Sequence, residues 1–243
     1  MQMILITGQA GVGKTTLAKL IAKEAFNTGQ IPVLMSFAGP LKEEASRKGY
    51  DKETNPEKYR SYCQEIGAAR REEDADYWVK KFDDALQTVV EQENEDIANN
   101  TKYWERVVIV DDCRYVNELA YGILYDACTL FMSYGNRHIE EFEWRSHPSE
   151  FMSQSIESGD DVLMHQFTDI VFNEGTQKDL TKIVKANFPI WCGTEVEIDD
   201  LDIPKDKPAP LQELVDNLID LLYLADLDTE EEEDDDDTEE SDD

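Results

Sequence analysis

The chain has 243 residues, and 40% of them are hydrophobic, which is enough to bury the core of one sizeable α/β domain or of two small ones. Its formal net charge is −32. Residues 226–243 carry fourteen acidic residues and no basic one, so the preceding residues still carry a net charge of −18. A surface this acidic repels nucleic acid and anionic membranes, so we expect neither as a partner.

The cysteines predict a reducing environment. They form no C-x-x-C pair and no metal-ligand spacing, which is typical of free thiols in a cytoplasmic protein: Cys63, Cys113, Cys128 and Cys192. We expect no signal peptide, because the amino terminus lacks a basic region, and no membrane-spanning segment, because no apolar run is long enough.

The first part of the chain alternates apolar runs with stretches of helical spacing. Residues 3–7, MILIT, predict a buried first strand. Residues 14–28 predict a helix whose apolar face is formed by Leu17, Leu20, Ile21 and Ala25. Residues 32–37 predict a second strand, which Gly39 and Pro40 end, and Pro40 lies near the start of another predicted helix.

The middle of the chain changes character twice. Residues 56–98 are polar and charged with few helix breakers, which predicts two or three helices. Residues 106–112, RVVIVDD, predict the clearest parallel-sheet strand, because four consecutive residues are β-branched. Residues 115–125 predict a helix, and residues 128–133 predict the next strand. Residues 134–166 are rich in charge, serine and histidine and only weakly periodic, so we expect a mobile segment there.

A last strand and helix complete the alternation. DIVFNEG, residues 169–175, predicts a short strand that ends in a turn, and residues 176–187 predict a helix. Alternating strands and helices are typical of a mostly parallel sheet with helices on both faces. We therefore expect an α/β fold.

The carboxyl-terminal part differs from the rest. Residues 188–225 form an extension, which begins with proline-containing sequence of no clear period and leads into a strongly amphipathic predicted helix at 210–227. This helix is expected either to pack on the body of the protein or to form a homodimer interface. Residues 226–243 are expected to form a disordered, solvated acidic tail, with mimicry of nucleic acid or recruitment of a basic partner as the alternative.

A glycine-rich loop carries the strongest single motif. Residues 8–15, GQAGVGKT, match G-x-x-x-x-G-K-[ST] between a predicted strand and a predicted helix, which is the setting of a P-loop for nucleoside triphosphates. Backbone N–H groups and the helix start would bind phosphate, Lys14 would bridge the outer phosphates, and Thr15 would bind Mg²⁺. We therefore expect ATP and Mg²⁺, held by Gly8, Gly11, Val12, Gly13, Lys14, Thr15 and Thr16.

Two aspartates and an arginine follow the VVIV strand. Asp111 and Asp112 come at its carboxyl end, where open parallel sheets bind ligands, so we expect one of these carboxylates to hold the metal directly or through water. Arg114 follows two residues later. We expect its guanidinium to bind an acceptor phosphate with bidentate geometry.

The scarce cations and the aromatic residues add further candidates. Each of five arginines can pair with a neighbouring acid, whereas phosphoryl transfer between two nucleotides needs several cations together: Arg60, Arg70, Arg71, Arg137 and Arg145. Trp78 is a candidate surface for a nucleobase, with core packing as the alternative. The histidines have no metal-ligand spacing and are expected at the surface or in a lid: His138, His147 and His165.

Six segments occur in an order that resembles a known family. They are GQAGVGKTT, SFAGPLKE, YCQEIGAARREEDADYWV, VIVDDCRYVNE, HPSE and VFNEGT. This order resembles bacteriophage-type deoxynucleoside monophosphate kinases, within the class of P-loop nucleotide kinases, over residues 1–187. SFAGPLKE together with DDCRYVNE is more specific than the P-loop, which many proteins share.

The resemblance implies ATP-dependent phosphoryl transfer to a deoxynucleoside 5′-monophosphate, which gives the diphosphate in phage nucleotide metabolism in the host cytoplasm. It implies that residues 56–98 bind the acceptor and that residues 134–166 form a lid. The implied acceptor-side residues are Phe37, Ala38, Pro40, Leu41, Lys42, Arg70, Asp76, Trp78 and Arg114. The implied catalytic residues are Lys14, Asp112, Arg114 and Arg145, with Thr15 and one of Asp111 and Asp112 at the metal.

Two other functions stay open. A P-loop kinase could phosphorylate a hydroxymethyl pyrimidine in phage DNA, with Asp112 or Asp111 as the base, although the negative charge disfavours a DNA-binding surface. A regulatory NTPase coupled to a partner would leave the SFAGPLKE segment unexplained. The sequence does not choose the nucleobase, because pocket contacts decide it.

Overall fold

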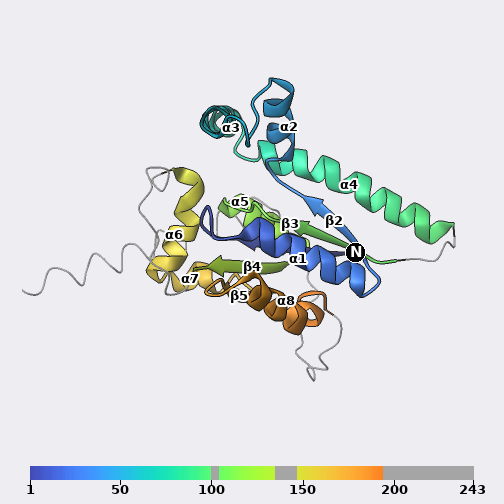
Figure 1. Cartoon of the computed structure of the whole chain (residues 1–243). Helices are drawn as coiled ribbons and strands as arrows, with labels where there is room; N and C mark the ends of the chain where they lie inside the picture. The colour runs from blue at the N-terminus through green and yellow to red at the C-terminus, as the bar shows by residue number, and fades with distance from the viewer. Residues whose placement is uncertain (100–103, 135–146, 194–243) are drawn as a thin grey trace, which may run out of the picture.

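The computed structural model describes residues 1–99, 104–134 and 147–193. At its centre lies a five-stranded, all-parallel sheet with the strand order β2-β3-β1-β4-β5 (Figure 1). The strands are β1 (Gln2–Thr7), β2 (Ile31–Met35), β3 (Arg106–Val110), β4 (Cys128–Ser133) and β5 (Asp169–Phe172). Every residue of β3 is buried, as its run of β-branched side chains requires.

The strand register brings three chain segments to one edge of the sheet. Ile4 on β1 lies opposite Ile109 on β3 and Cys128 on β4. The connection that leaves β1 leads to β2 on one side, whereas the connection that leaves β3 crosses β1 to reach β4 on the other side. The carboxyl end of β1 is therefore a topological switch point, which is where open α/β sheets bind ligands.

Helices cover both faces of the sheet. One face packs on α1 (Lys14–Asn27) and α8 (Gln177–Trp191). The other face packs on α4 (Tyr77–Ala98), α5 (Val116–Leu124), α6 (Phe151–Ser158) and α7 (Asp161–Met164). A short 3₁₀ turn, η2 (Pro148–Glu150), leads into α6. Two further helices, α2 (Gly39–Arg47) and α3 (Pro56–Glu73), pack on each other beyond the carboxyl end of β2 (Figure 1).

The α/β fold expected from the sequence is confirmed, and residues 56–98 form two helices, α3 and α4. The helix expected over 176–187 continues to Trp191 even though it contains Pro189. Trp191 is buried, and its indole N–H donates a hydrogen bond of 2.9 Å to Asp169, so tertiary contacts extend α8 beyond its predicted end.

Residues 147–166, the larger described part of the segment 134–166 that we expect to be mobile, have defined secondary structure, and the mobility itself stays a prediction. This part folds into η2, α6 and α7, and it buries Met152, Ile156 and Leu163 in the core. Serines and charged residues between these positions obscure their apolar spacing in the sequence. Among the described residues, no helix is both long and apolar enough to cross a membrane.

Several sequence-based expectations concern residues outside the described ranges. These are the roles of Arg137 and Arg145, the helix at 210–227 and the acidic tail at 226–243. They stay predictions.

Candidate active site

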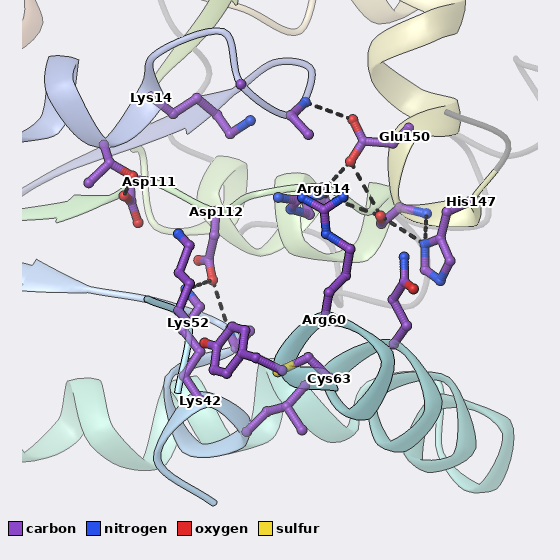
Figure 2. A pocket seen from close by; sticks show the side chains of 18 of the residues that line it. Lys14, Lys42, Lys52, Arg60, Cys63, Asp111, Asp112, Arg114, His147 and Glu150 are labelled. Atoms are coloured by element: carbon purple, nitrogen blue, oxygen red, sulfur yellow. Dashed lines mark hydrogen bonds and ion pairs between the residues drawn. The ribbon is translucent and has the colours of Figure 1, made fainter. Parts of the chain in front are cut away.

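A cavity of about 530 Å³ opens at the carboxyl edge of the sheet, beside the end of β1 (Figure 2). The glycine-rich loop and the first turn of α1 line one side of it, and α2 and α3 line the opposite side. The residues after β3 and those of η2 complete the lining. Figure 2 shows Lys14 and Asp111 on the loop side and Lys42 and Cys63 on the side of α2 and α3. Segments far apart in the sequence therefore share one cavity.

The glycine-rich loop has a backbone conformation that requires glycine. Gly8 and Gly13 have φ angles of 141° and 108°, and a Cβ atom at Gly8 would lie 2.3 Å from the carbonyl oxygen of Met132. Asn173, which follows β5, braces the loop by donating a hydrogen bond of 2.8 Å to the carbonyl oxygen of Val12. Gly13 is also the N-cap of α1 and brings no side chain to cap it. The N–H groups of the first turn can therefore bind an anion.

Lys14 lies against this loop with only 7% of its surface exposed. Its ammonium group donates hydrogen bonds to the carbonyl oxygens of Gly8 and Gln9, the second at 2.8 Å. Burial, and then the nearby positive charge of Arg114, lower the pKa of Lys14 from 10.5 to about 8. A bound anion would favour the charged form again, so Lys14 is suited to a phosphate ligand.

Asp111 contacts Thr15, the residue at the end of the glycine-rich loop. The Thr15 hydroxyl donates a hydrogen bond to Asp111, with 2.6 Å between Oγ1 and Oδ2. Hydroxyl and carboxylate oxygens are ligands that Mg²⁺ prefers, and Mg²⁺ usually takes its remaining ligands from water and substrate phosphates. The described residues contain no group of three or more His, Cys, Asp or Glu side chains that could hold a metal. The Thr15 and Asp111 oxygens could therefore supply at most part of the coordination of such an ion.

Asp112 has a different position from its neighbour. It is buried, and its carboxylate accepts hydrogen bonds from the Ser36 hydroxyl, from two backbone N–H groups at 2.9 and 3.2 Å, and from the Lys42 ammonium at 2.8 Å. The two backbone donors are Phe37 and Ala38, just before α2. Burial alone would raise the pKa of Asp112, but Lys42 and these hydrogen bonds outweigh burial and hold the pKa below its usual value. Asp112 thus fixes the start of α2 and the position of Lys42.

Arg114 lies between the loop and α3 (Figure 2). Its guanidinium donates to the carboxylate of Glu150 and, at 3.4 Å, to the hydroxyl of Ser149, both in η2. Its backbone N–H donates to Glu118 at 2.8 Å, which fixes the turn into α5. Glu150 in turn accepts a hydrogen bond of 2.8 Å from the backbone N–H of Ala10 in the loop. The geometry brings Arg114 to the centre of the site and identifies Glu150 as a site residue that the sequence did not single out.

A second arginine reaches the cavity from α3. Arg71 pairs with Glu118 at 3.2 Å, and its guanidinium lies 3.8 Å from the centre of the Tyr115 ring. Burial raises the pKa of Glu118 to about 7, against the opposing effect of Arg71. Arg71 is thus held by a carboxylate and a ring, with its charge at the lining of the cavity.

Sequence reasoning missed most of the α3 face that lines the cavity. Lys52, which precedes α3, also lines the cavity. The lining residues from α3 lie on one side of the helix: Pro56, Tyr59, Arg60, Cys63, Gln64 and Arg71. Only Arg60 and Arg71 belong to the arginines noted above. The spacing of three and four residues was a usable signal, because it places these side chains on one helix face. The face is polar, however, and a search for apolar periodicity does not detect it.

Two aromatic residues expected on the acceptor side lie in the core instead. Trp78 is 3% exposed, and its indole N–H donates a hydrogen bond of 3.2 Å to the carbonyl oxygen of Gly67 in α3. Phe37 is buried against Phe82, with 4.4 Å between the ring centroids, and against Tyr121. Neither ring lines the cavity, so neither can stack on a bound nucleobase in this conformation.

Two polar candidates also lie away from the cavity lining. Arg70 is exposed and pairs with Glu73 at 3.2 Å, one helical position from the face that carries Arg71. Asp76 is the N-cap residue of α4 and accepts a hydrogen bond of 2.9 Å from Asn117. By contrast, the lining does include Ala38, Leu41, Lys42, Asp111, Asp112 and Arg114, together with Lys14 and Thr15.

The cavity therefore has, at one end, loop N–H groups and Lys14, which can bind an anion, and several cations at the other. Its arrangement can bring two phosphorylated groups together around Arg114 and can screen their charges from each other. The chain matches no protein-family model, and no curated protein is similar enough to count as its relative.

Proposed function

We propose that the chain is a P-loop phosphotransferase that moves the terminal phosphoryl group of ATP to a deoxynucleoside 5′-monophosphate and forms the diphosphate. The observation that carries this proposal is the single cavity in which the loop with Lys14 faces the cations of α2 and α3 across Arg114. A hydrolytic NTPase would need the loop but would have no use for this second set of cations. The order of the sequence segments supports the same function.

Different residues of the chain bind the triphosphate and the acceptor phosphate. The loop N–H groups and Lys14 bind the triphosphate and hold its terminal group at the cavity. Thr15 and Asp111 would hold Mg²⁺, which when bound supplies positive charge to the phosphate oxygens. Lys42, Arg71 and Arg114 line the space for the acceptor phosphate, with Arg60 of α3 extending toward Arg114 (Figure 2).

Positioning and charge neutralisation account for catalysis in this proposal. An acceptor phosphate oxygen is already anionic, so the transfer needs no general base. Asp112 would be a poor base for a hydroxyl acceptor, because four donors engage its carboxylate and its pKa is held low. This argues against the alternative acceptor, a hydroxymethyl group on DNA, with Asp112 as its base.

We also propose that the protein works in the cytoplasm, where phage nucleotide metabolism takes place. The four cysteines are free thiols in the structure, which suits a reducing compartment.

An acceptor panel tests the function. ADP release from Mg-ATP would be followed with each deoxynucleoside and nucleoside monophosphate and with DNA that contains hydroxymethyluracil. We expect strong acceleration by a subset of the deoxynucleoside monophosphates. The acceleration should disappear in Lys14→Ala and persist in Lys19→Ala, which removes an exposed lysine from the same helix. The proposal would be contradicted if only the DNA accelerated ADP release. It would also be contradicted if ADP release were slow and had the same rate with and without every acceptor.

A further inference from the structure

Glu150 places a carboxylate in the anion site of the loop. The residue lies at the junction of η2 and α6 and is only 3% exposed. One carboxylate oxygen accepts the hydrogen bond from the backbone N–H of Ala10 at 2.8 Å. The other accepts from the guanidinium of Arg114 and, at 3.4 Å, from the Ser149 hydroxyl. Figure 2 shows Glu150 between the loop and Arg114.

These donors are of the kind that binds phosphate. Backbone N–H groups of a glycine-rich loop and a guanidinium fork both recognise phosphoryl oxygens. A carboxylate is also planar and anionic, so it can satisfy the same donors in place of a phosphoryl group. Burying it is costly unless it is paired, and here its partners are a loop N–H group and Arg114. A triphosphate that fills the loop must therefore compete with Glu150 for donors.

A second carboxylate ties the same helix to the same loop. Glu157, near the end of α6, accepts a hydrogen bond from the side chain of Gln9, the residue before Ala10. Glu150 and Glu157 lie seven residues apart and thus on one face of the helix. The two contacts differ in kind, because Glu157 binds a side-chain amide whereas Glu150 binds the loop backbone and Arg114. Glu157 therefore offers a matched control for loss of one carboxylate.

We propose that Glu150 is an internal substitute for a phosphoryl group: it occupies the loop when no nucleotide is bound, and a bound triphosphate displaces it. Displacement frees Arg114 for the substrate phosphates and releases η2 from the loop. Because part of the population is always in the occupied state, Glu150 weakens the apparent affinity of the loop for phosphate. The role in substrate binding rests on the proposed function, whereas the competition itself requires only an anion in the loop.

The competition between Glu150 and a phosphate ligand can be tested without catalysis, by measuring the binding of magnesium pyrophosphate with titration calorimetry. Glu150→Gln keeps the size of the side chain but loses its charge, so we expect it to bind pyrophosphate at least about fivefold more tightly than the wild type. Glu157→Gln should change this affinity by about twofold or less, because it leaves the loop N–H and Arg114 engaged. Unchanged or weaker binding by Glu150→Gln, or an equal gain in Glu157→Gln, would overturn the proposal.

A second measurement uses the wild-type chain and so does not depend on the folding of a variant. Amide hydrogen exchange over residues 148–158 should become faster when pyrophosphate saturates the loop, because η2 loses its contact with Ala10. Unchanged or slower exchange there would overturn the proposal. This proposal and the proposed function are tested by different results. If no monophosphate accelerated ADP release, the proposed function would fail, but tighter pyrophosphate binding by Glu150→Gln would still support the competition.

Discussion

The Thr15 hydroxyl donates its hydrogen bond to Asp111, at 2.6 Å, although Asp112 is the aspartate that lies two residues before Arg114 in the DDCRYVNE segment. Asp112 instead points to the start of α2 and pairs with Lys42 at 2.8 Å. Two adjacent carboxylates are thus assigned to opposite sides of the cavity. The sequence left the metal ligand open between them, and the geometry favours Asp111.

The aspartate pair predicts opposite effects of two similar substitutions. Asp111→Asn should lower activity by about 100-fold, as expected for loss of a group that holds or orients a metal, with little change in stability. Asp112→Asn should instead lower the free energy of unfolding by about 1–3 kcal/mol, because a buried acceptor of several hydrogen bonds loses its charge. Steady-state kinetics over a range of Mg²⁺ concentrations and urea unfolding of both variants check this. A loss of magnesium dependence in Asp112→Asn alone would reverse the assignment.

Neighbouring arginines on α3 predict a contrast in acceptor binding. Arg71→Ala should raise KM for the monophosphate by about 10- to 150-fold, because it removes a charge-assisted contact worth about 1.5–3 kcal/mol from the cavity lining. Arg70→Ala removes the same charge one residue away, from an exposed pair, and should change KM by about twofold or less. KM for ATP should stay unchanged in both variants. Equal effects of the two substitutions on the monophosphate would contradict the placement of the acceptor.

The pKa of Lys14 predicts how nucleotide binding varies with pH. Only the charged ammonium pairs with phosphate, so the affinity for Mg-ATP should fall as the pH rises through about 8. Arg114 is the second cause of the lowered pKa, so Arg114→Ala should move this decline to higher pH. Calorimetric titration with Mg-ATP at several pH values measures the midpoint. An unchanged midpoint in Arg114→Ala would show that the charge of Arg114 does not act on Lys14.

The same pKa makes a prediction for stability. The pKa of Lys14 is about 8 in the folded chain and 10.5 for a lysine exposed to water, so between these values the unfolded chain holds the extra proton and stability rises with pH. The cost of the buried charge is fully present below pH 8 and is removed by pH 10.5. Relative to Lys14→Met, the wild type should therefore gain up to about 3 kcal/mol across this window. Unfolding by urea at pH 7 and pH 10 gives the difference, and a constant value would contradict it.

The sheet could be predicted because its strands carry their signal locally. Residues 107–110 are four consecutive β-branched residues, and the β1 sequence is a short apolar run followed by a glycine-rich turn. Helices α6 and α7 could not be predicted in this way. Their buried core residues are few among many polar ones: Met152, Ile156 and Leu163. The burial of these few side chains depends on neighbours from other elements, which a local pattern does not contain.

The loop side of the site could be predicted in the same way, whereas on the α3 side the residue spacing indicates a polar helix face but not that this face lines the cavity. Gly8, Gly13 and Lys14 form one continuous motif whose spacing follows from the backbone geometry. Arg70 and Arg71 are chemically equivalent in the sequence, and only the orientation of α3 decides that Arg71 reaches the cavity. Trp78 was ambiguous for the same reason, since its burial depends on the carbonyl oxygen of Gly67 from another helix.

The central claim is that the terminal phosphoryl group of ATP passes to a second nucleotide. The most direct test incubates the chain with ATP labelled at its γ-phosphate and with deoxynucleoside monophosphates, and then separates the products. The account predicts label in a deoxynucleoside diphosphate, and no such product from Lys14→Ala. Label that appears only as inorganic phosphate would contradict the claim and would show that the cavity hydrolyses ATP without an acceptor.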